Sequence, residues 1–123
     1  LYIVPSQILG RLVTTDTPVQ VAAIGKRREL SRNRMISLAV AAERLQSPGN
    51  AGTLLRSCVG AGADGLWLSH DSVDSTHPKL LRAASGQWFR SPPESVDLQA
   101  WLRSQQSQGV QVLAADMDGP CYW

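Results

Sequence analysis

The stretch from residue 35 to residue 69 constrains the fold more than any other part of the chain. It begins with a run that is apolar at nearly every position (35–43), passes through a Ser-Pro-Gly-Asn-Ala-Gly loop, and continues into a segment with helical apolar spacing (50–62). A second apolar run follows at 65–69. Continuous apolar runs are typical of strands buried on both faces, and a helix between two strands makes them parallel neighbours. The stretch therefore predicts a strand–helix–strand unit.

The same alternation continues on both sides of this unit. Alternating β-branched residues predict strands at 19–24 and 110–115. Between them, a short helix is predicted at 77–85, with Pro78 in its first turn, and a longer amphipathic helix from about residue 96 to Gly109. The predicted fold class is α/β, with four neighbouring parallel strands flanked by helices.

Composition limits the functional classes that the chain can belong to. The 123 residues are 43% hydrophobic and 18% charged, which suits one domain with a core of its own, and no apolar run approaches the roughly 20 residues of a membrane span. The two cysteines and two histidines show no metal-ligand spacing, so we assign no metal and expect reduced thiols. We expect a cytoplasmic protein, or a stromal one if a transit peptide has been removed, without a membrane partner.

Charge is distributed unevenly along the chain. Residues 1–60 hold eight Lys and Arg against three Asp and Glu, whereas residues 61–123 hold four against seven. The densest basic stretch is an expected loop that is suited either to contact RNA phosphates or to serve as a solvated connector. Its cations are Lys26, Arg27, Arg28, Arg32 and Arg34.

Two glycine-rich loops have different expected roles. The sextet Gly-Ala-Gly-Ala-Asp-Gly at 60–65 has dinucleotide-binding spacing, but it follows a helix and precedes a strand, which is the wrong order for that site. We expect its glycines to end the helix and turn the chain. The Ser-Pro-Gly-Asn-Ala-Gly loop has the correct order, because ligands gather where a parallel strand leads into a helix.

Arg56 stands out in the helix that follows this loop. Gly52 lies one turn before it and Gly60 one turn after, and glycine in a helix interior costs about 1 kcal/mol relative to alanine. The spacing predicts that a ligand or a second chain approaches this face closely. Asn50, at the start of the helix, is of a residue type that favours the N-cap.

Four stretches in order along the chain resemble the SpoU/TrmH family of RNA 2'-O-ribose methyltransferases, in the knotted SPOUT class. Residues 43–69 resemble its first motif, with the core Asn50-x-Gly52-x-x-x-Arg56, and residues 15–24, 77–92 and 109–123 resemble further segments. The resemblance implies a SPOUT-like fold and methyl transfer from S-adenosylmethionine (AdoMet) to a ribose 2'-hydroxyl of tRNA or rRNA. It also implies a homodimer when the protein is complete.

The resemblance also implies roles for individual residues. Arg56 would lie near the target ribose and phosphate and help activate the 2'-hydroxyl, and Asn50 would shape the same pocket. A guanidinium stays charged, so Arg56 is suited to hold phosphate and stabilise a developing alkoxide. RNA contacts are implied for Lys79 and Arg82, and AdoMet contacts for Ala115 and Asp116.

The sequence also departs from the family pattern. Gln46-Ser47-Pro48 stands where Gln-Asp-Pro is frequent in the family, so a carboxylate is missing, and Ser85 lies one position later than the common pattern. The family's glycine-rich loop with its glutamate and its Ser-Leu-Asn stretch are absent. Because these motifs are absent, we expect residues 19–123 to be an incomplete SPOUT domain. We expect residues 1–18 to be a connector from an upstream RNA-binding domain. The knot-forming C-terminal part and most of the AdoMet pocket would be missing, and the chain alone would be inactive.

Two other interpretations stay open on the sequence. One is a non-catalytic RNA-binding or dimerising module that retains half of the fold. The other is a nucleotide-binding α/β protein of different chemistry, which rests on the strand–helix alternation and the misplaced glycine sextet.

The basic stretch generates a direct test. Replacing three of its five cations with alanine is expected to weaken RNA binding, measured by anisotropy titration at several salt concentrations. The slope of log affinity against log salt should fall by roughly one unit for each lost phosphate contact. An unchanged slope would make the stretch a solvated connector.

Overall fold

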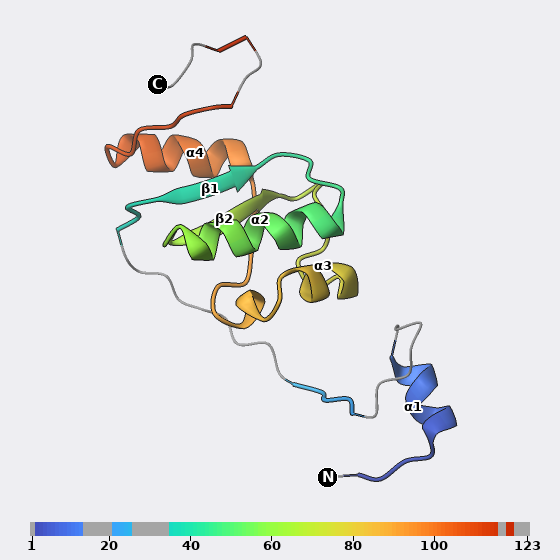
Figure 1. Cartoon of the computed structure of the whole chain (residues 1–123). Coiled ribbons are helices and arrows are strands. Elements are labelled where there is room, and N and C mark those ends of the chain that lie inside the picture. The colour runs from blue at the N-terminus through green and yellow to red at the C-terminus, as the bar shows by residue number, and fades with distance from the viewer. Residues whose placement is uncertain (1, 14–20, 26–34, 116–117, 120–123) are drawn as a thin grey trace. The chain divides into compact units, whose positions relative to one another are not determined.

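The chain forms two compact units, residues 1–34 and residues 35–123, in a computed structural model that describes residues 2–13, 21–25, 35–115 and 118–119 (Figure 1). In the first unit, helix α1 (Ser6–Leu12) follows Pro5 and buries none of its residues. This helix lies in the stretch expected to be a connector. The domain division predicted after residue 18 falls outside the described residues.

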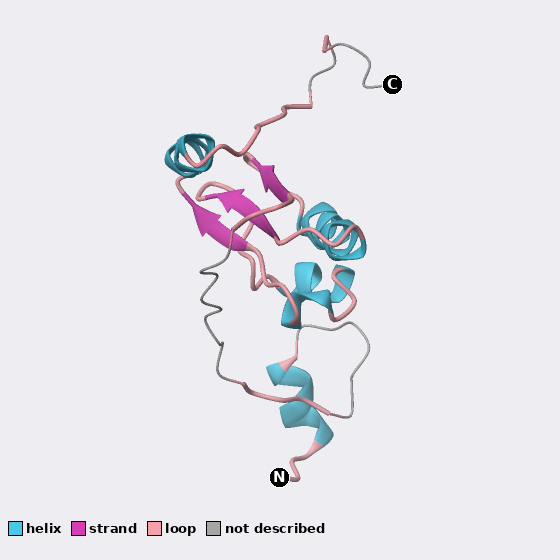
Figure 2. Ribbon diagram, turned by 90° about the vertical axis from the view of Figure 1, so that its left-hand side faces the viewer, coloured by secondary structure: helices cyan, strands magenta, loops and turns pink. Residues whose placement is uncertain are grey.

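A three-stranded parallel sheet organises the second unit. Its strands lie in the order β1 (Ala39–Ala42), β2 (Gly65–Ser69) and β3 (Glu94–Val96). The helical elements are α2 (Pro48–Gly60), α3 (Pro78–Ala83), the 3-10 turn η1 (Gln87–Phe89) and α4 (Leu98–Ser107). Helices α2 and α4 cover opposite faces of the sheet (Figure 2). The predicted parallel α/β class is confirmed.

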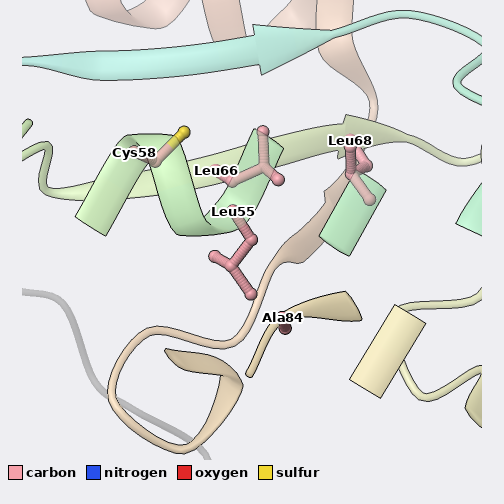
Figure 3. Packing of buried hydrophobic residues seen from close by; sticks show 5 residues of the cluster. All are labelled: Leu55, Cys58, Leu66, Leu68 and Ala84. Atoms are coloured by element: carbon pink, nitrogen blue, oxygen red, sulfur yellow. The ribbon is translucent and has the colours of Figure 1, made fainter. Parts of the chain in front are cut away.

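Strand β2 is buried along its whole length because its side chains alternate between two covered faces. Leu66 and Leu68 belong to one cluster with Leu55 and Cys58 of α2 and with Ala84 (Figure 3). Full burial of a leucine of this kind contributes about 1.5–3 kcal/mol. On the opposite face, the Trp67 ring stacks on the Trp101 ring of α4, with centroids 4.6 Å apart.

Both ends of α2 are fixed by local signals. Ser47 is the N-cap and Pro48 occupies the first position, where a missing N–H costs nothing. At the other end Gly62 has φ +73°, its N–H donates to Val59, and Ala63 N–H donates to Cys58, which together form a Schellman motif. The glycine sextet therefore ends the helix and turns the chain, as predicted, although α2 begins and ends two residues before the predicted 50–62.

Helix α3 packs tightly against α2 at Gly52, which is buried. A Cβ atom at this position would lie 2.6 Å from the Cβ of Ala83 and 2.6 Å from the carbonyl oxygen of Leu80. Real Cβ atoms do not approach so closely, so only glycine allows the two helices to meet at this distance. Pro78 occupies the first turn of α3, as predicted, and Gly86 has φ +81° shortly after its end.

Two predicted strands do not form in the residues that the structure describes. Residues 21–24, the described part of the predicted strand 19–24, have no regular structure, and Val21 and Ile24 are exposed. Residues 110–115 likewise form no strand, and the Val110 N–H donates to Gln105 at the end of α4. A strand exists only when another strand pairs with it, and the three-stranded sheet of the described residues includes neither segment.

The predictions for two further strands also need correction. The run 35–43 forms a strand only at 39–42, and none of these four residues is fully buried; β1 lies at the edge of the sheet that the described residues form. Strand β3 was not predicted, since its Glu-Ser-Val sequence lacks an apolar pattern. It forms because its backbone pairs with β2, where Trp67 lies opposite Glu94.

The contact at Gly52 generates a prediction about stability. In the full-length protein, Gly52→Ala should lower the free energy of unfolding by about 1–3 kcal/mol, because the added methyl group forces α3 away from α2. Gly60→Ala is the matched control, since nothing lies within 4 Å of its Cβ position, and alanine favours the helix. Denaturant melts that rank Gly52→Ala as stable as Gly60→Ala would contradict this packing.

Candidate functional site

The loop between β1 and α2 is tied to the loop that follows β2. The Arg44 N–H donates to Ser69 Oγ (2.8 Å), the Leu45 N–H donates to Ser72 Oγ (3.1 Å), and the Val73 N–H donates to the Leu45 carbonyl (2.9 Å). The Gln46 side chain also donates to the Asp71 carbonyl. These bonds join the carboxyl ends of neighbouring parallel strands, the edge where α/β proteins bind ligands. They fix the direction in which the chain enters α2.

The first turn of α2 places Asn50 differently from the prediction. The Asn50 N–H donates to Ser47 Oγ (3.3 Å), so Asn50 lies inside the helix and Ser47 is the cap. The predicted N-cap role of Asn50 is wrong because Pro48, which is suited to the first helical position, begins the helix two residues earlier. The Asn50 amide is exposed and makes no side-chain hydrogen bond with the described residues.

Asn50, Thr53 and Arg56 follow one another at three-residue spacing on the exposed side of α2. Residues three apart are neighbours on a helix, so the three form one inclined row about 9 Å long. Thr53 Oγ1 donates to the Gly49 carbonyl (3.0 Å), which engages the hydroxyl in the middle of the row. The row therefore offers solvent an amide at one end and a guanidinium at the other.

Arg56 is exposed and has no ion pair within the described part of the chain. The glycines beside it have other functions than the sequence predicted. The close approach at Gly52 is made by α3 of the same unit, not by a ligand or a second chain, and nothing lies within 4 Å of the Cβ position at Gly60. Arg56 is thus presented next to a helix–helix contact.

Lys79 joins this site from α3. Its Cε atom lies 3.8 Å from the Cβ position of Gly49, which places the lysine stem beside the first turn of α2. Its backbone N–H donates to His77 Nδ1 (3.1 Å), the cap of α3. Arg82 is exposed in the last turn of α3. The four residues that the resemblance assigned to catalysis and RNA binding within 48–83 therefore lie on two helices that pack against each other, with Lys79 beside the first turn of α2.

This layer contains no carboxylates. Residues 47–63 and 75–93 include no Asp or Glu, whereas they include Arg56, Lys79, Arg82 and Arg90. Positive side chains without neighbouring carboxylates, together with the positive end of the α2 dipole, attract anions. The layer is therefore suited to a polyanionic partner.

Other chemically capable side chains have structural roles. Asp74 Oδ1 accepts from the N–H and the hydroxyl of Thr76 (2.7 Å each), and His70 Nδ1 lies 3.0 Å from Ser95 Oγ. Burial raises the pKa of the Cys58 thiol, so it stays protonated and is not a nucleophile. Among the described residues, no group of three His, Cys, Asp or Glu side chains is placed to hold a metal ion.

Part of the predicted site lies outside the described residues. This applies to Asp116 and to the whole basic stretch with Lys26, Arg27, Arg28, Arg32 and Arg34. Ala115 is described but exposed, without regular structure. The described residues around Ala115 therefore do not enclose a cofactor.

The model of the SpoU rRNA Methylase family matches residues 37–122. The chain belongs to this family. The match covers the Asn50–Arg56 row and α3, and it confirms the family that the four sequence stretches indicated.

Named relatives agree with this assignment. The chain is 34% identical over 116 residues to an uncharacterized tRNA/rRNA methyltransferase of Synechocystis, covering 92% of this chain and 42% of the relative. It is 31% identical over 113 residues to the 23S rRNA guanosine 2'-O-methyltransferase RlmP of Bacillus subtilis, covering 90% and 44%. The chain thus spans less than half the length of these curated relatives.

A solved structure shares the fold. The SpoU methyltransferase AviRb of Streptomyces viridochromogenes, in complex with the cofactor AdoMet, superposes with a TM-score of 0.71 and 25% identity, over 88% of this chain and 44% of AviRb.

None of the helices in the described residues is long and apolar enough to cross a membrane.

The cap of α2 generates a prediction. Ser47→Ala should lower the free energy of unfolding of the full-length protein by about 1 kcal/mol, because the Asn50 N–H loses its acceptor. Ser47→Asp should preserve stability, since aspartate caps equally well and its charge favours a helix N-terminus. Thermal melts of both variants measure the difference, and an unchanged melting temperature in Ser47→Ala would mean that the cap contributes nothing.

Proposed function

We propose that this chain contributes part of the active site of an RNA 2'-O-ribose methyltransferase that uses AdoMet. The observation that carries the proposal is the exposed row on α2, which presents an unengaged amide and an unengaged guanidinium beside the cations of α3. The family match, the 2'-O-methyltransferase activity of RlmP and the AdoMet complex of the methyltransferase AviRb support it.

Arg56 is proposed to hold the RNA and to stabilise charge during the reaction. A planar guanidinium with five N–H donors can bind a phosphate oxygen and a second oxygen at the same time. As the 2'-hydroxyl loses its proton, negative charge develops on the ribose oxygen, and a fixed cation nearby lowers the energy of that state. Arg56 has no proton acceptor of its own, so its contribution is electrostatic rather than that of a general base.

Asn50 and the α3 cations are proposed to position the substrate. The Asn50 amide offers two donors and one acceptor, which suits hydrogen bonds to ribose hydroxyls. Lys79, beside the first turn of α2, would bind a neighbouring phosphate as a point charge, and Arg82 would extend the contact along α3.

When bound, AdoMet supplies the methyl group, which is bonded to its positively charged sulfur and is transferred to the ribose 2'-oxygen. The family resemblance assigns Ala115 and Asp116 to the AdoMet pocket. Two residues do not form a pocket, so other residues must complete it.

We propose further that the full-length protein acts in the cytoplasm as a homodimer on tRNA or rRNA. RNA is the partner that the acid-free layer favours.

The test is Arg56→Lys in the full-length protein. Lysine keeps the charge but loses the planar two-pronged geometry, so single-turnover methyl transfer should slow by about 30- to 1,000-fold, the equivalent of roughly 2–4 kcal/mol. AdoMet affinity and melting temperature should stay near normal, because Arg56 is exposed.

Arg103→Lys is the matched control, since Arg103 is an exposed arginine on α4, against the other face of the sheet. Normal turnover in Arg56→Lys would mean that charge alone suffices. If the wild-type protein binds RNA but transfers no methyl group to it, the chain belongs to a non-catalytic RNA-binding module and the proposal fails.

A further inference from the structure

Phe89 is a large aromatic side chain that the fold leaves open. It is 81% exposed, although the residue before it is half-buried and the prolines after it, Pro92 and Pro93, are buried. Phe89 lies in the 77–92 stretch that resembles a family segment, but the resemblance assigned no role to it and the proposed reaction does not use it. An isolated exposed apolar residue is common, so its surroundings decide whether it has a function.

The neighbouring Trp88 side chain supports the Phe89 ring. Trp88 packs against the hydrophobic core, and its Nε1–H donates to the Ser75 carbonyl (2.8 Å), which fixes the indole. The Phe89 ring meets this indole edge to face, with centroids 5.5 Å apart and an angle of 84° between the planes. Aromatic pairs prefer this geometry, so the phenyl ring has a supported orientation.

The backbone under Phe89 is also well defined. The Phe89 N–H donates to the Gly86 carbonyl (3.2 Å), and the N–H groups of Arg90 and Ser91 both donate to the Gln87 carbonyl (3.0 Å each). Gly86 takes φ +81°, a conformation that favours glycine and turns the chain from α3 into η1. An ordered ring that is presented to solvent loses little entropy on binding a partner.

The cations in the same segment as Phe89 indicate the kind of partner that the ring suits. The acid-free segment 75–93 includes Lys79, Arg82 and Arg90, and Arg90, which directly follows Phe89, is exposed and makes no ion pair with the described residues. A partner that needs both an aromatic face and several cations carries flat rings and negative charges. Single-stranded nucleic acid has both, since its bases stack on aromatic side chains while its phosphates bind Arg and Lys.

We propose that Phe89 is a stacking platform for one unpaired base of the RNA substrate and that Arg90 binds a phosphate next to that base. The platform belongs to the same layer as the Asn50–Arg56 row, because both α3 and η1 pack against α2. This inference rests on the proposed function for the identity of the RNA as substrate, but it concerns binding alone. A paired base offers no open face, so the platform selects single-stranded RNA over duplex RNA.

The experiment compares variants of the full-length protein by fluorescence anisotropy, with a single-stranded RNA oligonucleotide and a fully paired duplex of the same sequence as probes. Phe89→Leu, which keeps an apolar side chain but removes the ring, is expected to weaken single-strand binding by about 5- to 100-fold. Its duplex binding should be unchanged, and Phe89→Tyr should bind both RNAs as the wild type does. Melting curves should be the same for all three proteins, because the ring is exposed.

Arg90→Ala tests the second half of the proposal, with Arg103→Ala as its control. It should lower the slope of log affinity against log salt by about 0.7 for the single strand, whereas Phe89→Leu should leave that slope unchanged. An unchanged slope in Arg90→Ala, or a fall as large in Arg103→Ala, would remove Arg90 from the platform.

Three results for Phe89→Leu would overturn the stacking proposal. They are wild-type affinity for the single strand, an equal loss for the single strand and the duplex, and loss of self-association with RNA binding intact, which would make Phe89 a protein contact. Methyl transfer is measured in parallel. Failure of the wild type to methylate any RNA would refute the proposed function without altering the binding comparison, whereas normal methylation with unchanged binding in Phe89→Leu would refute only the platform.

Discussion

The second unit depends on one strand whose two faces are both covered. Leu66 and Leu68 of β2 pack toward α2, and Trp67 between them stacks on Trp101 of α4. The strand also pairs with β1 on one side and with β3 on the other. It therefore contacts both of the other strands and a helix on each face of the sheet. Because alternation along a strand is strict, a shift of one residue would place the indole among the leucines and the leucines against α4. The positions of both helices therefore follow from the side-chain order of five residues.

The site on α2 follows from this arrangement in two steps. Packing against β2 sets which side of α2 is buried, and so leaves Asn50, Thr53 and Arg56 exposed. The contact at Gly52 then holds α3 against α2, which brings Lys79 beside the first turn. One glycine in the family motif is thus structural, while the asparagine and the arginine on either side of it are exposed. The motif combines a packing requirement with two polar groups that the fold itself does not use.

The sequence predicted best those elements whose local pattern and tertiary environment agree. Strand β2, the apolar side of α2 and the amphipathic helix α4 all match their sequence signals, and the family core identified the α2 row. Residues 21–24 and 110–115 have good strand propensity but no pairing partner, whereas β3 has little propensity and forms by pairing. Ser47 and Asn50 are both good caps, and only the adjacent Pro48 favours Ser47. What fills the space beside a glycine is a tertiary fact, so Gly52 indicated a close approach but not that α3 makes it.

The loop that leads into α2 has a further consequence. Arg44 has φ +48°, which is strained for a non-glycine residue, and the conformation persists because bonds to Ser69, Ser72, Asp71 and Val73 surround it. Since Ser69 and Ser72 also contact each other (2.9 Å), loss of one bond weakens the acceptor of the next. The bonds that hold Arg44 in this conformation are the same bonds that set the direction in which the chain enters α2. The exposed amide of Asn50 is therefore positioned by the loop that follows β2 as well as by its own helix.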